Sequence, residues 1–253
     1  MNFDNIYRKG GRPSAIAIAQ ASNLYVYCIG NPIRYIDPLG LSMYVIGGDG
    51  KVVELDPSQP VSVIDGSGNT TTYDNWIGIS MIDGSGSVST ITGSILNIPI
   101  FNQLNTTTVG ANNLCWATTA AMWAAFLLGD TDDRTEQIAR SVTGIFTGDG
   151  FNQAWSWAST DALGLGIVDA QTQLWGNLSI DAIQATIDGN SPFGVLYRDA
   201  NSGHWILGTG YINIPGQETH IVSNDPWGGA QSSRTYSDFQ TLPDGRSWSW
   251  TAQ

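Results

Sequence analysis

The sequence predicts an α+β domain over residues 97–253, in which helices come first and an antiparallel sheet follows. Apolar residues recur at helical spacing after residue 112, and the C-terminal third changes to short apolar runs of the kind found in strands. Helices that precede strands along the chain are typical of the α+β class. Hydrophobic residues make up 42% of the 253 residues and charged residues 13%, as in a globular protein.

Three helices are expected in the first part of this domain. The first begins at Asn112, where Asn112 or Asn113 can cap it, and Gly129 ends it. Two further helices are expected over residues 134–142 and 180–187, and the second of them lies between a serine that can cap it and a glycine that can end it. Strands are then expected over residues 192–197, 204–212 and 219–223.

Residues 42–96 form a separate β-rich segment. Apolar and polar positions alternate there between glycine-rich turns, which predicts β-hairpins. The repeated pentapeptides Ile64-Asp-Gly-Ser-Gly68 and Ile82-Asp-Gly-Ser-Gly86 could suggest calcium loops, but Thr70 and Trp76 occupy the positions where an EF-hand needs glycine and glutamate. We therefore interpret the repeats as turns and the segment as a hairpin linker or collar.

The charge of the chain is uneven and excludes some partners. The net charge is −12 overall, and no lysine follows Lys51. An acidic surface repels phosphate backbones, so we expect no nucleic-acid partner. No apolar run approaches the ~18 residues of a membrane span, and the N-terminus lacks the basic and apolar regions of a secretory signal. We therefore expect neither a membrane span nor a signal peptide.

The few cysteines and histidines argue against a metal and against a disulfide framework. The chain has two cysteines, Cys28 and Cys115, and two histidines, His204 and His220. None of the four lies at the close spacing that is typical of metal ligands. We expect no metal and no other cofactor. A lone cysteine with a distant histidine and aspartate fits a catalytic thiol better.

Cys115 is the candidate nucleophile. The expected helix places it in the first turn, where unpaired backbone N–H groups and the helix dipole favour a thiolate. The alternative is a small buried core residue, which is a common fate of a free cysteine.

His204 is the candidate base, and Asp225 is the candidate that orients it. His204 opens a strand after a flexible Ser-Gly pair, so its imidazole is expected at a sheet edge, whereas His220 lies inside a strand and fits a structural role. Asp225 follows another strand and can accept an N–H hydrogen bond from the imidazole. Asn224 is the alternative for this third position, and an ordinary turn is the alternative for the whole Asp-Pro-Trp-Gly-Gly segment.

These motifs together resemble a papain-like cysteine peptidase. The matching pieces are Asn113-Leu-Cys-Trp-Ala-Thr118, Ser202-Gly-His-Trp-Ile206 and Asn224-Asp-Pro-Trp-Gly228. Papain has Asn-Ser-Trp-Gly at the last place, and the Asp-Pro form is closer to the bacterial branches of bacteriocin-processing transporters and plant-pathogen effectors. The resemblance covers about residues 97–229. It implies a papain-like fold, with a helix that carries the nucleophile and a C-terminal antiparallel sheet.

The resemblance also implies a glutamine that stabilises the oxyanion. The family usually carries it about six residues before the cysteine, where this chain has Val109. Bacterial relatives often show Ile-Pro-x-x-x-Gln, and Ile98-Pro-Ile-Phe-Asn-Gln103 reproduces that pattern twelve positions before Cys115. We expect Gln103 to take the oxyanion role with the backbone N–H of Cys115, while Asn112 and Asn113 remain alternatives.

An N-terminal segment resembles a second family. Residues 10–41 end in Asn31-Pro-Ile-Arg-Tyr-Ile-Asp-Pro-Leu-Gly-Leu41, which is similar to the end of an Rhs (YD-repeat) core. In that family this signature borders a variable C-terminal toxin, so residues 1–41 are interpreted as a core remnant and the rest as its passenger. Asp37 matches one of the two aspartates used for self-cleavage, but the first Asp-Pro-x-Gly copy is missing.

The predicted function is therefore a polymorphic-toxin effector with cysteine endopeptidase activity. The resemblances imply an Rhs shell and delivery apparatus, export without a signal peptide, a protein substrate in the target-cell cytoplasm, and a cognate immunity protein. A glutamine deamidase or transglutaminase on the same triad is the main alternative. A peptidoglycan peptidase is less favoured because its Asp-Cys-Ser-Gly signature is missing, and a non-enzymatic β-module would make the triad a coincidence.

Overall fold

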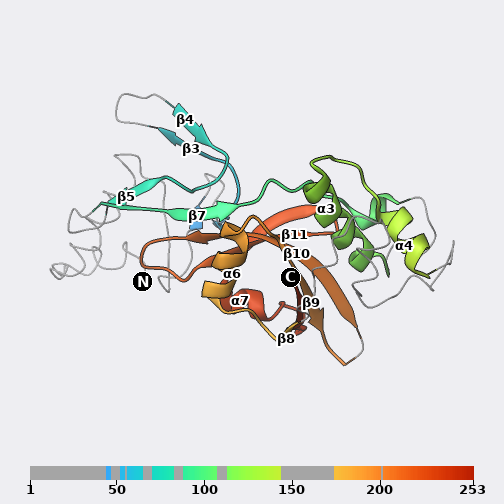
Figure 1. Cartoon of the computed structure of the whole chain (residues 1–253). Helices are drawn as coiled ribbons and strands as arrows, with labels where there is room; N and C mark the ends of the chain where they lie inside the picture. The colour runs from blue at the N-terminus through green and yellow to red at the C-terminus, as the bar shows by residue number, and fades with distance from the viewer. Residues whose placement is uncertain are drawn as a thin grey trace, which may run out of the picture. The chain divides into compact units, whose positions relative to one another are not determined.

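The computed structural model describes residues 44–46, 52–54, 56–64, 70–82, 88–106, 113–143, 174–200 and 202–253 (Figure 1). The chain divides into two compact units. One unit comprises residues 1–55, 59–91 and 215–217, and the other comprises residues 56–58, 92–214 and 218–253. The Rhs-like segment and Cys28 lie outside the described residues.

The described part of the first unit consists of antiparallel hairpins. The paired strands are β1 (Tyr44–Ile46) with β2 (Val52–Glu54), β3 (Val61–Ile64) with β4 (Thr70–Tyr73), and β5 (Ser80–Ile82) with β6 (Val88–Thr90). Each Ile-Asp-Gly-Ser-Gly repeat begins at the last residue of one strand and leads to its antiparallel partner. That is the position of a hairpin connection.

The second unit is built on one antiparallel sheet, with strand order β12-β11-β10-β9-β13-β8 and with β7 paired to β10. The strands are β7 (Thr92–Ile95), β8 (Leu174–Trp175), β9 (Phe193–Arg198), β10 (Gly203–Asn213), β11 (His220–Asp225), β12 (Ala230–Thr235) and β13 (Ser247–Ala252). The helices are η1 (Gln103–Asn105), α3 (Cys115–Leu128), α4 (Thr135–Thr143), α6 (Ile180–Asp188) and α7 (Tyr236–Gln240).

This arrangement confirms the helices and strands expected in the domain. Helices α4 and α6 and strands β9, β10 and β11 coincide with the expected ranges to within one or two residues at each end. Ser179 caps α6 by accepting the Ala182 N–H at 3.2 Å. The described helices and the antiparallel sheet are compatible with the α+β class.

Helix α3 ends as expected but begins differently. Gly129 adopts the left-handed conformation with φ 68°, and its N–H reaches the carbonyls of Ala125 and Phe126. Among the described residues, the expected cap is wrong. Leu114 occupies the N-cap position and forms no capping hydrogen bond through its side chain, and Asn113 lies one residue before it. Leu114 is fully buried, so core packing fixes the approach of the chain to the helix.

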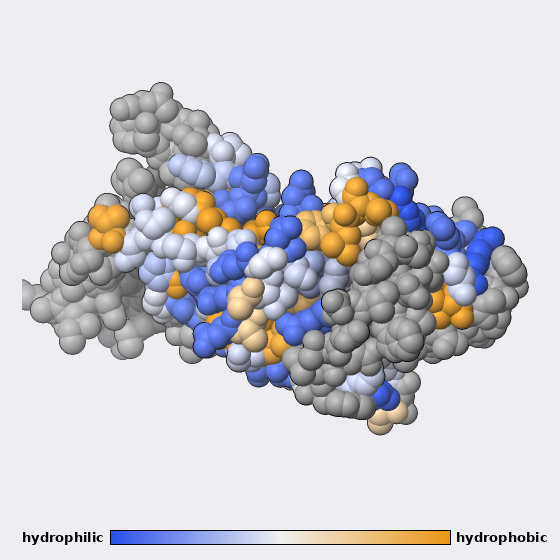
Figure 2. Space-filling view, in the orientation of Figure 1, coloured by the Kyte–Doolittle hydropathy of each residue, from blue (hydrophilic) through white to orange (hydrophobic). Residues whose placement is uncertain are grey.

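Helix α3 is central to the core. Every residue from Cys115 to Ala125 is buried, and Thr119 Oγ1 donates to the Trp205 carbonyl at 3.3 Å. A helix that is apolar on all sides belongs inside a protein. Its C-terminal end is different, since Leu127 and Leu128 are exposed, and Figure 2 shows hydrophobic surface over the position of α3 in Figure 1.

The sequence predicts a domain that begins at residue 97, and the second unit also includes residues 92–96. Strand β7 pairs with β10, and Gly93 makes this possible because a Cβ there would lie 2.3 Å from the Tyr211 carbonyl oxygen. Asp56 also belongs to this unit, since its carboxylate accepts the N–H and hydroxyl of Ser233 at 3.0 and 2.6 Å. Part of the segment assigned to the linker therefore packs with the sheet.

Aromatic packing fixes β9 and β13 against α7. The rings of Phe193 and Trp248 stack with centroids 6.1 Å apart, and Phe239 meets Trp248 edge-on at 5.4 Å. The Tyr197 hydroxyl donates to the Phe239 carbonyl. Among the helices of the described ranges, none is long and apolar enough to cross a membrane.

Candidate active site

Cys115 is the first residue of helix α3. Its exposed fraction is 9%, and it is a free thiol. The first backbone N–H groups of a helix have no partner within the helix, and the aligned peptide dipoles place partial positive charge there. The fold therefore puts the sulfur where a negative charge is stabilised.

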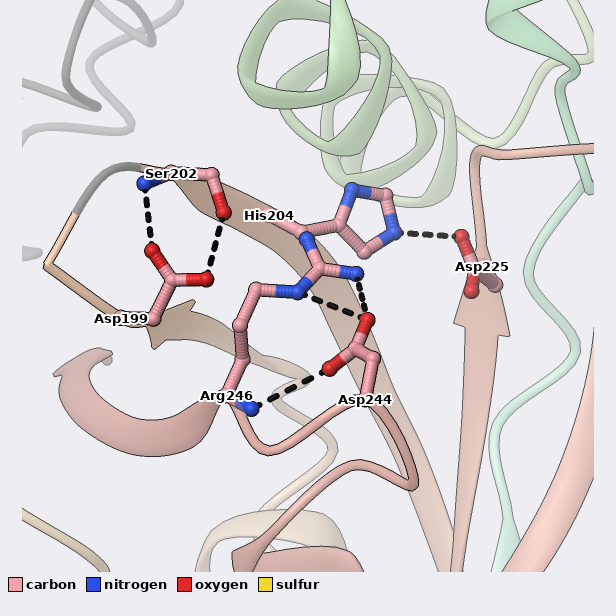
Figure 3. A network of polar contacts seen from close by, with 6 residues as sticks. All are labelled: Asp199, Ser202, His204, Asp225, Asp244 and Arg246. Carbon is pink, nitrogen blue, oxygen red and sulfur yellow. Dashed lines mark hydrogen bonds and ion pairs between the residues drawn. The ribbon is translucent and has the colours of Figure 1, made fainter.

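His204 and Asp225 lie at neighbouring strand ends. His204 is the second residue of β10 and Asp225 is the last residue of β11, and these strands pair antiparallel. The start of one strand therefore meets the end of the other. The His204 Nε2 atom donates to Asp225 Oδ1 at 2.7 Å (Figure 3).

The His204 side chain also interacts with Cys115, and this interaction helps to raise the pKa of the imidazole. Because Nε2 is occupied by Asp225, the ring offers Nδ1 to the sulfur, and Figure 3 shows this second nitrogen on the side of the helix. His204 thus interacts with Cys115 through one side of its ring and hydrogen-bonds to Asp225 through the other. The structure brings together the three residues that the sequence singled out for nucleophile, base and orienting carboxylate.

The environment of His204 favours its charged form. Burial by itself lowers the pKa of the imidazole, because a charge is costly away from water. The hydrogen bonds to Asp225 and Cys115 and the charges of both groups outweigh that cost and raise the pKa of His204 to about 9. The imidazole is therefore a cation at neutral pH, next to a sulfur at a helix N-terminus.

Asp225 is held in place by its own turn. Its Oδ1 also accepts the Trp227 N–H at 2.8 Å. Asn224, the alternative third residue, is engaged elsewhere: its Nδ2 donates to the Ile98 carbonyl at 3.4 Å and its Oδ1 accepts from Gln231 at 3.0 Å. The structure thus pairs His204 with Asp225.

Gln103 lies beside this turn. It is fully buried at the start of η1, and its backbone N–H donates to the Pro226 carbonyl at 2.9 Å. The segment that was expected to supply an oxyanion donor is therefore in direct contact with the residue that follows Asp225. Of the alternatives, Asn113 is half-buried and Asn112 lies outside the described residues.

One pair beside the site was missed by sequence reasoning. Arg246 Nε donates to Asp244 Oδ2 at 2.9 Å, and Figure 3 shows this pair in the network around His204. The charge of His204 helps to lower the pKa of Asp244, after the hydrogen bonds from Arg246. The sequence around the pair indicates only a Pro-Asp-Gly turn, so it carried no signal of this location.

No cluster of three or more histidine, cysteine, aspartate or glutamate side chains within the described ranges could hold a metal ion. The other histidine, His220, lies in β11 with Nδ1 3.5 Å from the Ser233 hydroxyl, well along the strand from Asp225. What the arrangement offers is a buried sulfur, a cationic imidazole and a fixed carboxylate. That combination serves nucleophilic attack on a carbonyl carbon.

Comparison with known families decides the assignment. A family model described as Peptidase_C39 like family matches residues 95–252, which is more than half of the chain. The chain belongs to the Peptidase_C39-like family. A comparison with curated proteins gave no match.

Membership in the Peptidase_C39-like family confirms the expectation of a cysteine peptidase-type domain at the general level. The matched residues begin at the last residue of β7 and end at the last residue of β13, so they contain all the other strands of the sheet in the second unit. Cys115, His204, Asp225 and Gln103 all lie inside the match. The Rhs-like segment precedes it.

Proposed function

We propose that this Peptidase_C39-like chain is a papain-like cysteine endopeptidase in which Cys115, His204 and Asp225 form the catalytic triad. The observation that carries the proposal is the 2.7 Å hydrogen bond between His204 and Asp225, in a ring that also interacts with Cys115 at the start of α3. Residues from α3, β10 and β11 have no structural need to converge at one point. Their convergence supports a chemical role.

The reaction is acyl transfer from a peptide to sulfur. The Cys115 thiolate forms a bond to the peptide carbonyl carbon, and the carbonyl oxygen takes up the electron pair as an oxyanion. Gln103 and the Cys115 backbone N–H donate hydrogen bonds to that oxyanion. The carbon–nitrogen bond then breaks as His204 gives its proton to the departing amine.

Water completes the cycle. Neutral His204 takes a proton from water while the oxygen attacks the thioester, and the acid product leaves as the carbon–sulfur bond breaks. The proton on His204 and the charge on sulfur are thereby restored. Asp225 keeps the ring oriented and stabilises the imidazolium throughout, without taking the proton itself.

The sequence supports a toxin context for this activity. The Asn31-to-Leu41 segment resembles an Rhs core terminus upstream of the peptidase domain. An Rhs-type effector would be delivered into a target cell by a secretion apparatus, act in its cytoplasm on a protein substrate, and be neutralised in the producer by an immunity protein. This context rests on the sequence resemblance.

The test is expression of the wild-type chain and of Cys115→Ala in a susceptible cell, followed by a proteome-wide search for new protein termini. The proposal expects new termini with the wild type and none with the variant, because loss of the nucleophile costs orders of magnitude in rate. New termini that persist in Cys115→Ala would overturn it. A gain of about one dalton on target glutamines without cleavage, or cross-linked amines, would instead assign a deamidase or transglutaminase.

A further inference from the structure

The loop between β11 and β12 contacts both sides of the proposed machinery. Asp225 pairs with Ala230 in the strand register, so the loop consists of residues 226–229. Two glycines close it, Gly228 with φ 89° and Gly229 with φ 65°. Both lie in the left-handed region that side chains other than glycine rarely adopt.

Two residues of this loop form hydrogen bonds with different parts of the proposed site. At its start the Trp227 N–H donates to the Asp225 carboxylate at 2.8 Å. Its Pro226 carbonyl accepts the Gln103 N–H at 2.9 Å. One short connection therefore fixes the carboxylate of the triad and the backbone of the proposed oxyanion donor.

The last residue of the loop, Gly229, packs closely against Asn102, the residue before Gln103. A Cβ on Gly229 would lie 2.8 Å from the Cβ of Asn102, 3.3 Å from its Cα and 3.4 Å from its backbone nitrogen. A contact at 2.8 Å is shorter than real Cβ atoms make, so Asn102 would have to shift. A Cβ on Gly228 would meet no atom within 4 Å.

Asn102 also organises the turn that holds Gln103. Its Oδ1 accepts the Leu104 N–H at 2.9 Å and caps η1. Thr106 Oγ1 donates to the Gln103 carbonyl at 3.0 Å and closes the same turn. A displacement of Asn102 would therefore be passed on to Gln103.

We propose that Gly229 is a positioning residue for the oxyanion donor: its lack of a side chain lets the β11–β12 loop close on Asn102 and so sets where Gln103 stands relative to Cys115. This inference rests on the proposed role of Gln103. Gly229 itself touches no reacting atom. It acts through Asn102, while His204 and Asp225 keep their own hydrogen bond.

The experiment compares Gly229→Ala with Gly228→Ala. Both variants place a methyl group on a left-handed residue of the same loop, so backbone strain is common to them, and only Gly229→Ala collides with Asn102. Misplacement of a catalytic group by about 1 Å can cost about a hundredfold in rate. We expect Gly229→Ala to lower kcat by about tenfold to a hundredfold more than Gly228→Ala, with KM nearly unchanged, in cleavage of denatured cell extract followed through new termini.

A second readout separates positioning from general damage. Alkylation of Cys115 by iodoacetamide needs the thiolate but forms no oxyanion, so its rate and pH profile should be the same in both glycine variants and in the wild type. Equal kcat losses in the two variants, or a parallel loss of alkylation in Gly229→Ala, would overturn the inference. Cleavage retained by Cys115→Ala would instead overturn the proposed function, so the two failures are distinguishable.

Removing the colliding atom from the other side tests the steric contact. In Gly229→Ala with Asn102→Gly, the Cβ of residue 102 is gone and the closest contact disappears, while Asn102→Gly alone measures the loss of the Asn102 cap. Substitutions in contact are non-additive, so the double variant should lose less kcat than the two single variants lose in combination. Losses that combine without interaction would argue against steric transmission through Asn102.

The inference stays testable if Gly229→Ala fails to fold. Asn102→Ala removes the acceptor for the Leu104 N–H without touching the loop, and loss of such a cap costs folding stability only modestly. We expect lower kcat with unchanged iodoacetamide alkylation. Full kcat in Asn102→Ala would contradict a role for this turn in placing Gln103.

Discussion

Nε2 of His204 and Oδ1 of Asp225 are 2.7 Å apart, although the two residues are separated by 21 positions in the chain. The antiparallel pairing of β10 and β11 accounts for this closeness, because it places the first residues of one strand beside the last residues of the other. The same oxygen accepts the Trp227 N–H at 2.8 Å, which helps to hold the carboxylate beside the imidazole. The ring is left with Nδ1 facing Cys115.

The first prediction concerns the charge of Asp225. Asp225→Asn keeps an oxygen acceptor for His204 but removes the negative charge that helps to raise the pKa of the imidazole to about 9. The lowering of the pKa by burial is then opposed by less negative charge, so the pKa of His204 falls. We expect an alkaline limb of kcat/KM near pH 9 in the wild type and at lower pH in Asp225→Asn.

Asp244→Asn is the matched control for this change. It removes one carboxylate that senses the charge of His204 but has no hydrogen bond to the ring. It should move the alkaline limb by much less than Asp225→Asn does. Equal shifts in the two variants would mean that the hydrogen bond itself contributes little.

The second prediction concerns stability and pH. The pKa of His204 is about 9 in the folded protein against an ordinary value of 6.5, so the folded state holds the proton more tightly. The resulting stabilisation is fully present below pH 6.5 and is lost as the pH rises towards 9, and its size is of the order of 3 kcal/mol. Denaturant unfolding of the wild type and of His204→Gln at pH 6 and pH 9.5 measures it. If the free energy of unfolding changed equally between pH 6 and pH 9.5 in both proteins, the raised pKa of His204 would be contradicted.

Much of this site could be predicted from the sequence because its residues sit at element boundaries. Gly129 and Ser179 mark helix ends, and apolar periodicity locates α3, β10 and β11. Once those elements are placed, Cys115 falls at a helix start and His204 and Asp225 at strand ends. Local signals thus determine which residues are candidates for chemistry.

Contacts between distant segments could not be predicted in the same way. Strand β12 is a run of mostly polar residues and forms because β11 offers it an edge, whereas β13 alternates serine and tryptophan and could have been recognised. The contact of Gly229 with Asn102 depends on a loop that meets a segment more than a hundred positions earlier. No local pattern encodes such a meeting.

The third prediction separates the two neighbouring candidates for the orienting residue. Asn224 is fully buried and bonded to Ile98 and Gln231. Because successive side chains of a strand point to opposite faces, it points away from the face of β11 that presents Asp225. Asn224→Ala should lower the free energy of unfolding by about 1–3 kcal/mol, because a buried carbonyl and amide lose their partner. The pH profile of kcat/KM should stay as in the wild type. A shifted alkaline limb in Asn224→Ala would show that Asn224 also acts on the imidazole.

The fourth prediction concerns the glycine that lets the strand carrying His204 pack. Gly208 pairs with Phe193 across β10 and β9, and a Cβ on Gly208 would lie 2.2 Å from the phenyl ring. The ring has little room to move, since Phe193 is fully buried and stacks on Trp248. Gly208→Ala should therefore lower the free energy of unfolding by about 1–3 kcal/mol or more.

Gly194→Ala is the control for this last change, because it adds the same methyl group to the partner strand β9. Its nearest neighbour would be the Cβ of Ala252 at 3.2 Å, a contact that a small adjustment can relieve. Urea unfolding should therefore show a clearly smaller loss than in Gly208→Ala. Equal losses would mean that both substitutions act through strand propensity and that the Phe193 ring yields. The contrast matters for function because His204 is the second residue of β10. A collision between the Phe193 ring and a methyl group at position 208 would displace the strand that holds the base.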